Sequence, residues 1–174
     1  MTKAIARLAF VLVLLSATWA SAADFKEFGR SGVWKISGQQ GLCQIGTGLD
    51  AGQMQFALTK DGTVITLQSL SWSGMRQPRS NMFKVTLYFD GKKFTRTDAL
   101  VISQVRLFQV FLFDASDPQH QKQFWQTLAR SNEMAVAVPF QSSRLRFSVS
   151  GIGKAYALVP KCSNRYLKGV ALPF

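Results

Sequence analysis

Two cysteines and one histidine are the side chains in this sequence best suited to chemistry. Cys43 and Cys162 are the only cysteines, and His120 is the only histidine. Two thiols in an oxidising compartment form a disulfide, although two free thiols are the competing interpretation. One histidine is too few for a His-based metal cage, and His120 stands among polar residues where we expect solvent exposure. We predict a Cys43–Cys162 disulfide, no metal site and no cofactor.

Other catalytic patterns are weak. The segment Gly151–Lys154 partly matches a phosphate-binding loop, but Ser148 replaces the first required glycine and Ala155 replaces the required Ser or Thr. Three acidic residues are explained by expected turns and a helix cap: Asp61, Asp90 and Asp117. The other acids form no motif, so we predict a protein that is not an enzyme. A hydrolase with carboxylate or His120 chemistry is the alternative.

A polar loop supplies the predicted binding residues. Arginine, tryptophan and methionine are enriched at protein interfaces, and the loop contains Trp72, Met75, Arg76 and Arg79. In the alternative interpretation, Trp72 ends a strand inside the core and both arginines are only solvated. The apolar C-terminal tail, Tyr166–Phe174, either packs on the domain or inserts into a partner.

The N-terminal residues have the three-part pattern of a secretory signal peptide. Lys3 and Arg7 precede an apolar run at Leu8–Leu15, and small residues follow up to Ala22. The run is too short to span a bilayer, which takes about 20 apolar residues. We predict cleavage after Ala22, so residues 1–22 are the signal and residues 23–174 form a single domain. The mature protein is then periplasmic or secreted, with no transmembrane segment.

The chain is strongly basic. It has 21 Lys and Arg against 9 Asp and Glu, which gives a formal net charge of +12. Such a surface attracts anionic partners through a salt-sensitive field. The cations are scattered in the sequence, and the longest run is the pair Lys92–Lys93. Solubility or loose envelope attachment therefore competes with a specific partner, and nucleic acid is not specifically indicated.

Short segments of alternating polarity predict a mainly β domain. The expected strands are Val33–Ser37, Leu42–Ile45, Gln53–Thr59, Thr63–Trp72, Phe83–Phe89, Lys92–Thr97, Val105–Phe113, Met134–Val138 and Leu145–Val149. Asp61-Gly62 and Asp90-Gly91 lie between apolar runs, which is typical of hairpin turns. Val105–Phe113 is apolar at nearly every position, so we expect it to be a central strand.

Two short helices are predicted. The first has Asp117 as its N-cap and begins at Pro118. Its apolar face, formed by Phe124 and Leu128 and widened by Trp125, is expected to pack on a sheet. Its polar face is expected to point to water and carries Gln121, Lys122 and Arg130. The second is capped by Ser150 and ended by Pro160 before Cys162. The predicted fold is an antiparallel β-sandwich with two short helices and one disulfide.

The segment Phe147–Gly151, leading through Ala155 and Leu158 to Cys162, resembles the closing motif of the invasion-associated locus B family. Trp34 before Cys43 extends the resemblance to the front of the domain. The resemblance implies a secreted or periplasmic proteobacterial protein with a role at the host surface and no assigned catalytic centre. A Trp-x-x-Cys-like opening and a further cysteine, expected in closer members, are absent from this sequence.

These features predict a non-enzymatic periplasmic or secreted binding protein, with a host-interaction role implied by the resemblance. Its expected partner is a protein or an anionic component of the envelope or host surface. An inhibitor or immunity protein that uses the Trp72–Arg79 loop against an envelope enzyme is an alternative. A final strand of an outer-membrane barrel is a structural rival for the tail, but Pro173 and the cysteine pair disfavour it. The sequence does not define the oligomeric state.

Overall fold

The protein is described from a computed structural model over residues 25–47, 54–68, 82–102, 107–114, 117–139 and 142–168. Its strands are β1 (Lys26–Ser31), β2 (Trp34–Gln39), β3 (Leu42–Gly46), β4 (Met54–Thr59), β5 (Gly62–Gln68), β6 (Met82–Phe89), β7 (Lys92–Ile102), β8 (Leu107–Asp114), β9 (Glu133–Ala137) and β10 (Leu145–Ser148). Its described helices are α2 (Pro118–Arg130), α3 (Ile152–Tyr156) and α4 (Val159–Tyr166).

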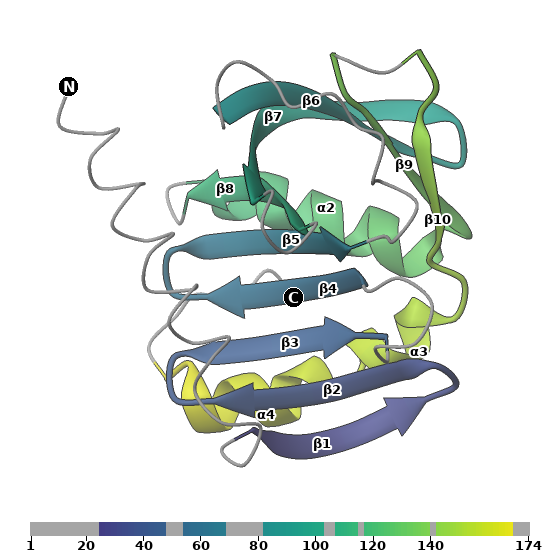
Figure 1. Cartoon of the computed structure of the whole chain (residues 1–174). Helices are drawn as coiled ribbons and strands as arrows, with labels where there is room; N and C mark the ends of the chain where they lie inside the picture. Colours follow the sequence, from purple (N-terminus) through teal and green to yellow (C-terminus); the bar gives the residue numbers. More distant parts are fainter. Residues whose placement is uncertain are drawn as a thin grey trace, which may run out of the picture.

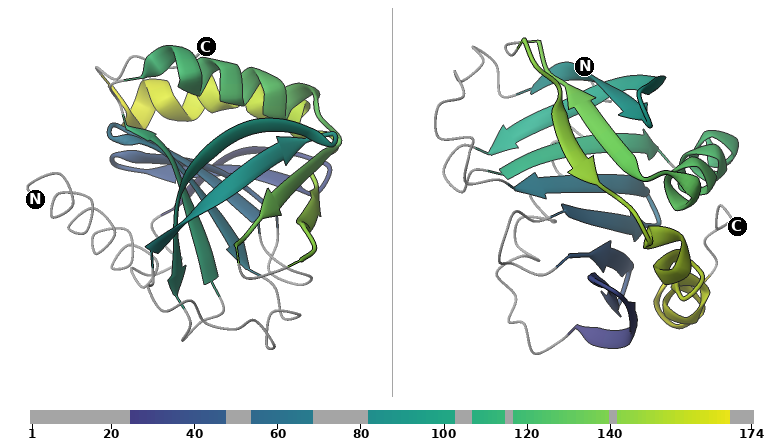
Figure 2. Two further views of the ribbon diagram at one scale, coloured as in Figure 1. Left: turned by 90° about the horizontal axis from the view of Figure 1, so that it is seen from above. Right: turned by 90° about the vertical axis from the view of Figure 1, so that its right-hand side faces the viewer.

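The described strands form one continuous antiparallel ladder. Their order is β1-β2-β3-β4-β5-β8-β7-β6-β9-β10. The sheet bends strongly, so that β9 and β10 run across the direction of β1–β5 in Figure 1. The predicted class, mainly β with antiparallel strands, short helices and one disulfide, is confirmed. Its layers are this bent sheet and the helices, which lie together on one side of the sheet in both views of Figure 2.

Both predicted hairpins are present. Strands β4 and β5 pair across Lys60-Asp61, and β6 and β7 pair across Asp90-Gly91. Asp90 has φ +47° and Gly91 has φ +78°, the left-handed conformation that Asp tolerates and Gly favours in tight turns. These two residues therefore account for the second reversal.

Strand β8 lies in the interior of the ladder, as predicted for the apolar segment Val105–Phe113. It pairs with β5 on one side and with β7 on the other. Strand β1 was not predicted from the sequence. This edge strand is polar and has a register shift between Glu27 and Gly29, so it lacks the regular alternation that marks the other strands.

One face of the sheet packs against the helices and forms the main core. Alternate side chains of β2–β6 and β9 point into it, which is the period of a strand with one face covered. Phe56 lies at its centre, with its ring 6.1–6.3 Å from those of Trp34, Phe124 and Trp125. The buried indoles keep hydrogen-bond partners: Trp34 Nε1 donates to the Ser150 carbonyl, and Trp125 Nε1 donates to Thr63 Oγ1.

Helix α2 begins as predicted. Asp117 is the N-cap and its carboxylate accepts from the His120 backbone N–H at 3.0 Å, while Pro118 starts the helix. Phe124, Trp125 and Leu128 are buried against the sheet. The prediction that Gln121 faces water is wrong, because Gln121 is only 5% exposed. It precedes Phe124 and Trp125 by three and four residues and so lies on their face of the helix.

The end of the domain differs from the prediction. Helix α3 has Gly151, at φ +81°, as its N-cap, so Ser150 does not cap it. Pro160 was expected to end this helix, but it lies in the first turn of a further helix, α4, where a missing backbone N–H breaks no helical bond. Cys162 therefore belongs to a helix instead of following one.

A disulfide joins Cys43 and Cys162, as predicted, and the free-thiol interpretation is wrong. The bridge connects β3 to α4 across 119 residues of sequence, and both side chains are buried. It ties an early strand to the last described helix. None of the helices in the described part of the chain is long and apolar enough to cross a membrane.

Candidate functional site

The binding residues predicted from the sequence lie outside the described residues. This applies to Trp72, Met75, Arg76 and Arg79, to the signal peptide at residues 1–22 and to the tail beyond Lys168. The loop thus stays a prediction. Three other features of the described residues could carry a function: the surroundings of His120, one surface pocket, and the charged outer surfaces of the sheet and helices.

His120 lies in the first turn of α2, where its position is explained by helix capping and ring packing. Its Nδ1 is 3.7 Å from Asp117 Oδ2, and its ring centroid is 5.5 Å from that of Phe94. Within the described ranges, no group of three or more His, Cys, Asp or Glu side chains could hold a metal ion. The two cysteines are bonded to each other. The histidine thus has no thiol nucleophile to activate.

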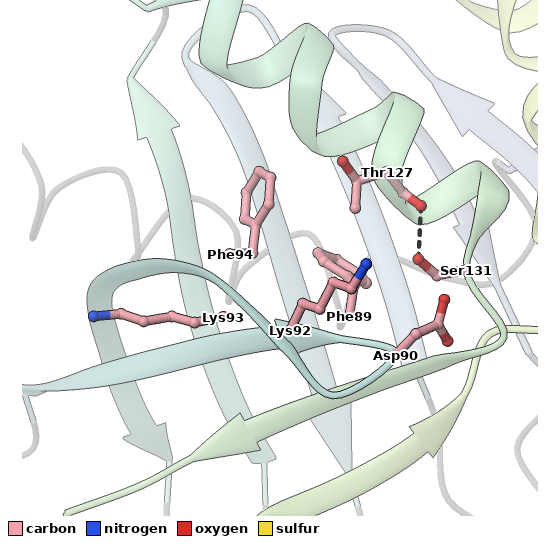
Figure 3. Close-up of a pocket in the computed structure, with 7 residues that line it drawn as sticks. All are labelled: Phe89, Asp90, Lys92, Lys93, Phe94, Thr127 and Ser131. Atoms are coloured by element: carbon pink, nitrogen blue, oxygen red, sulfur yellow. Dashed lines mark hydrogen bonds between the residues drawn. The ribbon is translucent and has the colours of Figure 1, made fainter.

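A surface pocket of about 240 Å³ lies between the β6–β7 hairpin and the C-terminal half of α2. Figure 3 shows its lining: Phe89, Asp90, Lys92, Lys93, Phe94, Thr127 and Ser131. Lys92 extends toward the end of the helix, whereas Lys93 points away from it (Figure 3). A cation near the free carbonyls at a helix C-terminus is favourable. The position of Lys92 therefore has a structural explanation.

The carboxylate of Asp90 holds the hairpin against the start of β9. Its Oδ1 accepts from the Glu133 N–H at 2.9 Å and the Asn132 N–H at 3.0 Å. The Asp90 N–H donates to the Glu133 carbonyl at 3.0 Å. The bonds from Glu133 and Asn132, with a smaller effect of the Ser131 hydroxyl, lower the pKa of the Asp90 carboxyl. The acid of this pocket is therefore an anchor of the fold.

Charges of both signs lie on the outer face of the β6–β10 half, and two of its cations form ion pairs. Lys84 Nζ lies 2.7 Å from Asp98 Oδ1, and Arg146 Nη1 donates to Glu133 Oε1 at 2.7 Å. The Arg144 guanidinium lies 3.6 Å from the centre of the Tyr88 ring, a cation–π contact. This face mixes both signs of charge, as expected for a solvated sheet surface.

The helical side of the sheet is different, because its exposed charges are nearly all positive. We define the basic helical surface by five exposed residues of the helices and their ends: Arg130, Lys154, Lys161, Arg165 and Lys168. The end of α2 and the start of α3 touch, since a Cβ on Gly153 would come 2.4 Å from the Ala129 carbonyl oxygen. This contact brings the segments that carry Arg130 and Lys154 together.

The sequence contains a signal for this surface, although it has no long run of cations. Glu133 is the last acidic residue of the chain. Six cations follow it: Arg144, Arg146, Lys154, Lys161, Arg165 and Lys168. Lys161, Arg165 and Lys168 recur at intervals of four and three residues, the spacing of one helical face. Segregation of charge along the chain, and not its clustering in runs, marks the site.

Helix α4 presents its cations from a fixed position. Val159, Cys162 and Ser163 are buried on its inner side, while Lys161 and Arg165 are exposed. The Cys162 disulfide attaches the inner side to β3. The helix is therefore amphipathic, with its apolar face already buried in the protein's own core and its basic face in solvent.

Helix stability explains some of these cations but not all of them. Arg130, Lys154 and Arg165 lie in the last turns of α2, α3 and α4, where a positive charge complements the helix dipole. Lys161 is the third residue of α4, whose first turn has no acidic residue. A cation there opposes the dipole. Lys161 is thus unfavourable for the stability of α4, and helix capping does not explain its presence.

No family model matches the chain, and neither does any curated protein or solved structure.

Proposed function

We propose that this protein is a non-enzymatic binding protein of the periplasm or the extracellular space, and that its basic helical surface contacts an anionic partner. One observation carries the proposal: the exposed charges of α2–α4 and their ends are cationic except for Asp117 at the start of α2, and no acidic residue follows Glu133 in the sequence. A surface of one sign attracts an oppositely charged partner over about the Debye length, roughly 8 Å at physiological salt.

Two further features support this proposal. The N-terminal pattern ending at Ala22 predicts export, and the Cys43–Cys162 disulfide is compatible with an oxidising compartment. The resemblance of the segment around Phe147–Cys162 to the invasion-associated locus B family favours a partner at a host surface or in the bacterial envelope. A host-interaction role is part of the proposal on that basis.

Salt-dependent binding to a soluble polyanion tests this proposal. The mature protein would be applied to immobilised dextran sulfate, and its elution salt compared with that of Lys161→Gln/Arg165→Gln. The matched control is Lys93→Gln/Arg96→Gln, which removes two exposed cations from β7 and has the same net charge. Figure 3 shows Lys93 pointing away from the helix.

The proposal predicts that the α4 variant elutes at clearly lower salt than the β7 variant. Equal elution of the two variants would mean that only net charge matters, and the proposal would fail. Failure of the wild-type protein to bind at low salt would also overturn it.

A further inference from the structure

We infer that the anionic partner of the basic helical surface is a phospholipid bilayer with an acidic headgroup, on which the domain docks through α4 without inserting. This inference rests on the proposed function and adds the partner's class. A bilayer surface is a flat, repeating array of phosphates that attracts clustered Lys and Arg near it.

The surroundings of the cations favour a flat, diffuse partner over a shaped one. A protein interface is organised around apolar or aromatic anchors, and single-stranded nucleic acid binds by stacking bases on exposed rings. Among the described residues, the large apolar side chains that are exposed are Val33 and Met82. Neither belongs to α3 or α4. The described part of this surface recognises charge without an apolar anchor.

The rings near α4 are turned into the protein. Tyr166 packs edge-on against Phe28 with centroids 5.7 Å apart, and Tyr156 stacks on Trp125 at 5.4 Å. Both tyrosines pack on the main core. They are thus engaged within the domain, and the exposed part of α4 consists of Lys161, Asn164 and Arg165.

The disulfide determines how the helix can meet a bilayer. An amphipathic helix that inserts must turn its apolar face toward the acyl chains. Val159 and Cys162 are buried in the core, and Cys162 is bonded to Cys43 on β3. To insert, α4 would have to turn Val159 and Cys162 out of the core while the disulfide still holds the helix to β3. Docking must therefore be electrostatic, reversible and sensitive to salt.

The expected strength follows from the number of cations. Each Lys or Arg near an anionic bilayer contributes about 1 kcal/mol, or about fivefold in affinity. Removing both Lys161 and Arg165 should then weaken vesicle binding by roughly 25-fold. Neutralising Lys93 and Arg96, which are exposed on β7 and are not part of this surface, should change it far less, because an exposed charge acts over only about the Debye length.

The test is sedimentation of the oxidised mature protein with large vesicles. Phosphatidylcholine vesicles are compared with vesicles containing phosphatidylglycerol, for the wild type, Lys161→Gln/Arg165→Gln and Lys93→Gln/Arg96→Gln. Thermal unfolding of each variant confirms that it is folded. We expect binding only to the acidic vesicles, loss of binding in the α4 variant, and near-retention in the β7 variant.

The outcomes separate this inference from the proposed function. Binding to dextran sulfate through α4 without binding to acidic vesicles would overturn the bilayer inference and leave the proposed function standing. Binding to neither would overturn both. Equal loss in the two variants, or binding that persists at high salt, would also contradict docking by α4 cations.

Discussion

Gly38 lies directly against Cys162, so closely that a Cβ on this glycine would come 2.3 Å from the cysteine Sγ and 2.8 Å from the Leu42 carbonyl oxygen. Helix α4 can therefore pack this closely against β2 only because Gly38 has no side chain. The sulfur also lies 3.8 Å from the Ser37 carbonyl oxygen. This contact sets the position of the helix that presents the basic surface.

Gly38→Ala should consequently destabilise the domain, although Gly38 does not have a left-handed backbone. Overpacking a filled core costs about 1–3 kcal/mol. The control is Gly46→Ala on the next strand, where the nearest atom to the added Cβ is 3.4 Å away. Urea unfolding should give a lower midpoint for Gly38→Ala and little change for Gly46→Ala; similar midpoints would contradict the packing argument.

Removing the disulfide should lower stability more strongly. Cys43→Ala/Cys162→Ala is expected to lose about 2–5 kcal/mol of unfolding free energy, the usual effect of a native bridge that closes a long loop. Denaturant unfolding with and without dithiothreitol measures this. Reductant should destabilise the wild type and leave the variant unchanged, and a wild type that does not respond would argue against the bridge.

The parts of this fold that were predictable from sequence depend on local rules. The Asp-Gly hairpins, the Asp117-Pro118 helix start and the alternating strand Phe83–Phe89 each follow from a few neighbouring residues. Their positions in the structure agree with those rules. Neighbouring residues were sufficient to predict an element wherever their local preferences agree with the final fold.

The wrong predictions concern residues whose surroundings are determined by contacts with segments distant in sequence. Pro160 is compatible with either end of a helix, and helix α4, in whose first turn it lies, packs against β2 and β3, which are distant from it in sequence. Gln121 is buried because the sheet lies over its side of α2. The proximity of Arg130 to Lys154 was unpredictable for the same reason, since the segments that carry them are brought together by the contact of Ala129 with Gly153.

Asp90 should make stability dependent on acid pH. Its folded-state pKa is lowered by the Glu133 and Asn132 backbone bonds. Its stabilising effect is therefore complete above the unfolded pKa of about 3.9 and is lost as the pH falls through the lower folded value. Asp90→Asn retains an acceptor oxygen and tolerates the turn, but it does not titrate. The stability advantage of wild type over this variant should shrink on acidification; a constant difference would contradict this role.

Tyr156 should produce the opposite effect at alkaline pH. Burial against Trp125 raises the pKa of its phenol to about 12. The neutral phenol's stabilising effect is complete below the unfolded pKa of about 10 and is lost as the pH rises toward the folded value. Between these values, wild type should lose more stability than Tyr156→Phe in urea unfolding. Parallel pH profiles for the two proteins would show that this phenol is not the sensitive group.

Lys161 offers a test in which stability and binding change in opposite directions. Lys161→Glu replaces a cation that opposes the α4 dipole with an anion that complements it. We expect a gain of about 0.3–1 kcal/mol in unfolding free energy, measured at low ionic strength. The same change removes one cation from the basic helical surface, so binding to acidic vesicles should weaken. Arg165→Glu is the matched control, because this residue lies in the last turn of the same helix. It should weaken binding while also lowering stability. If Lys161→Glu instead destabilised the domain, the lysine would have a structural role, and its use as evidence for a binding surface would be lost.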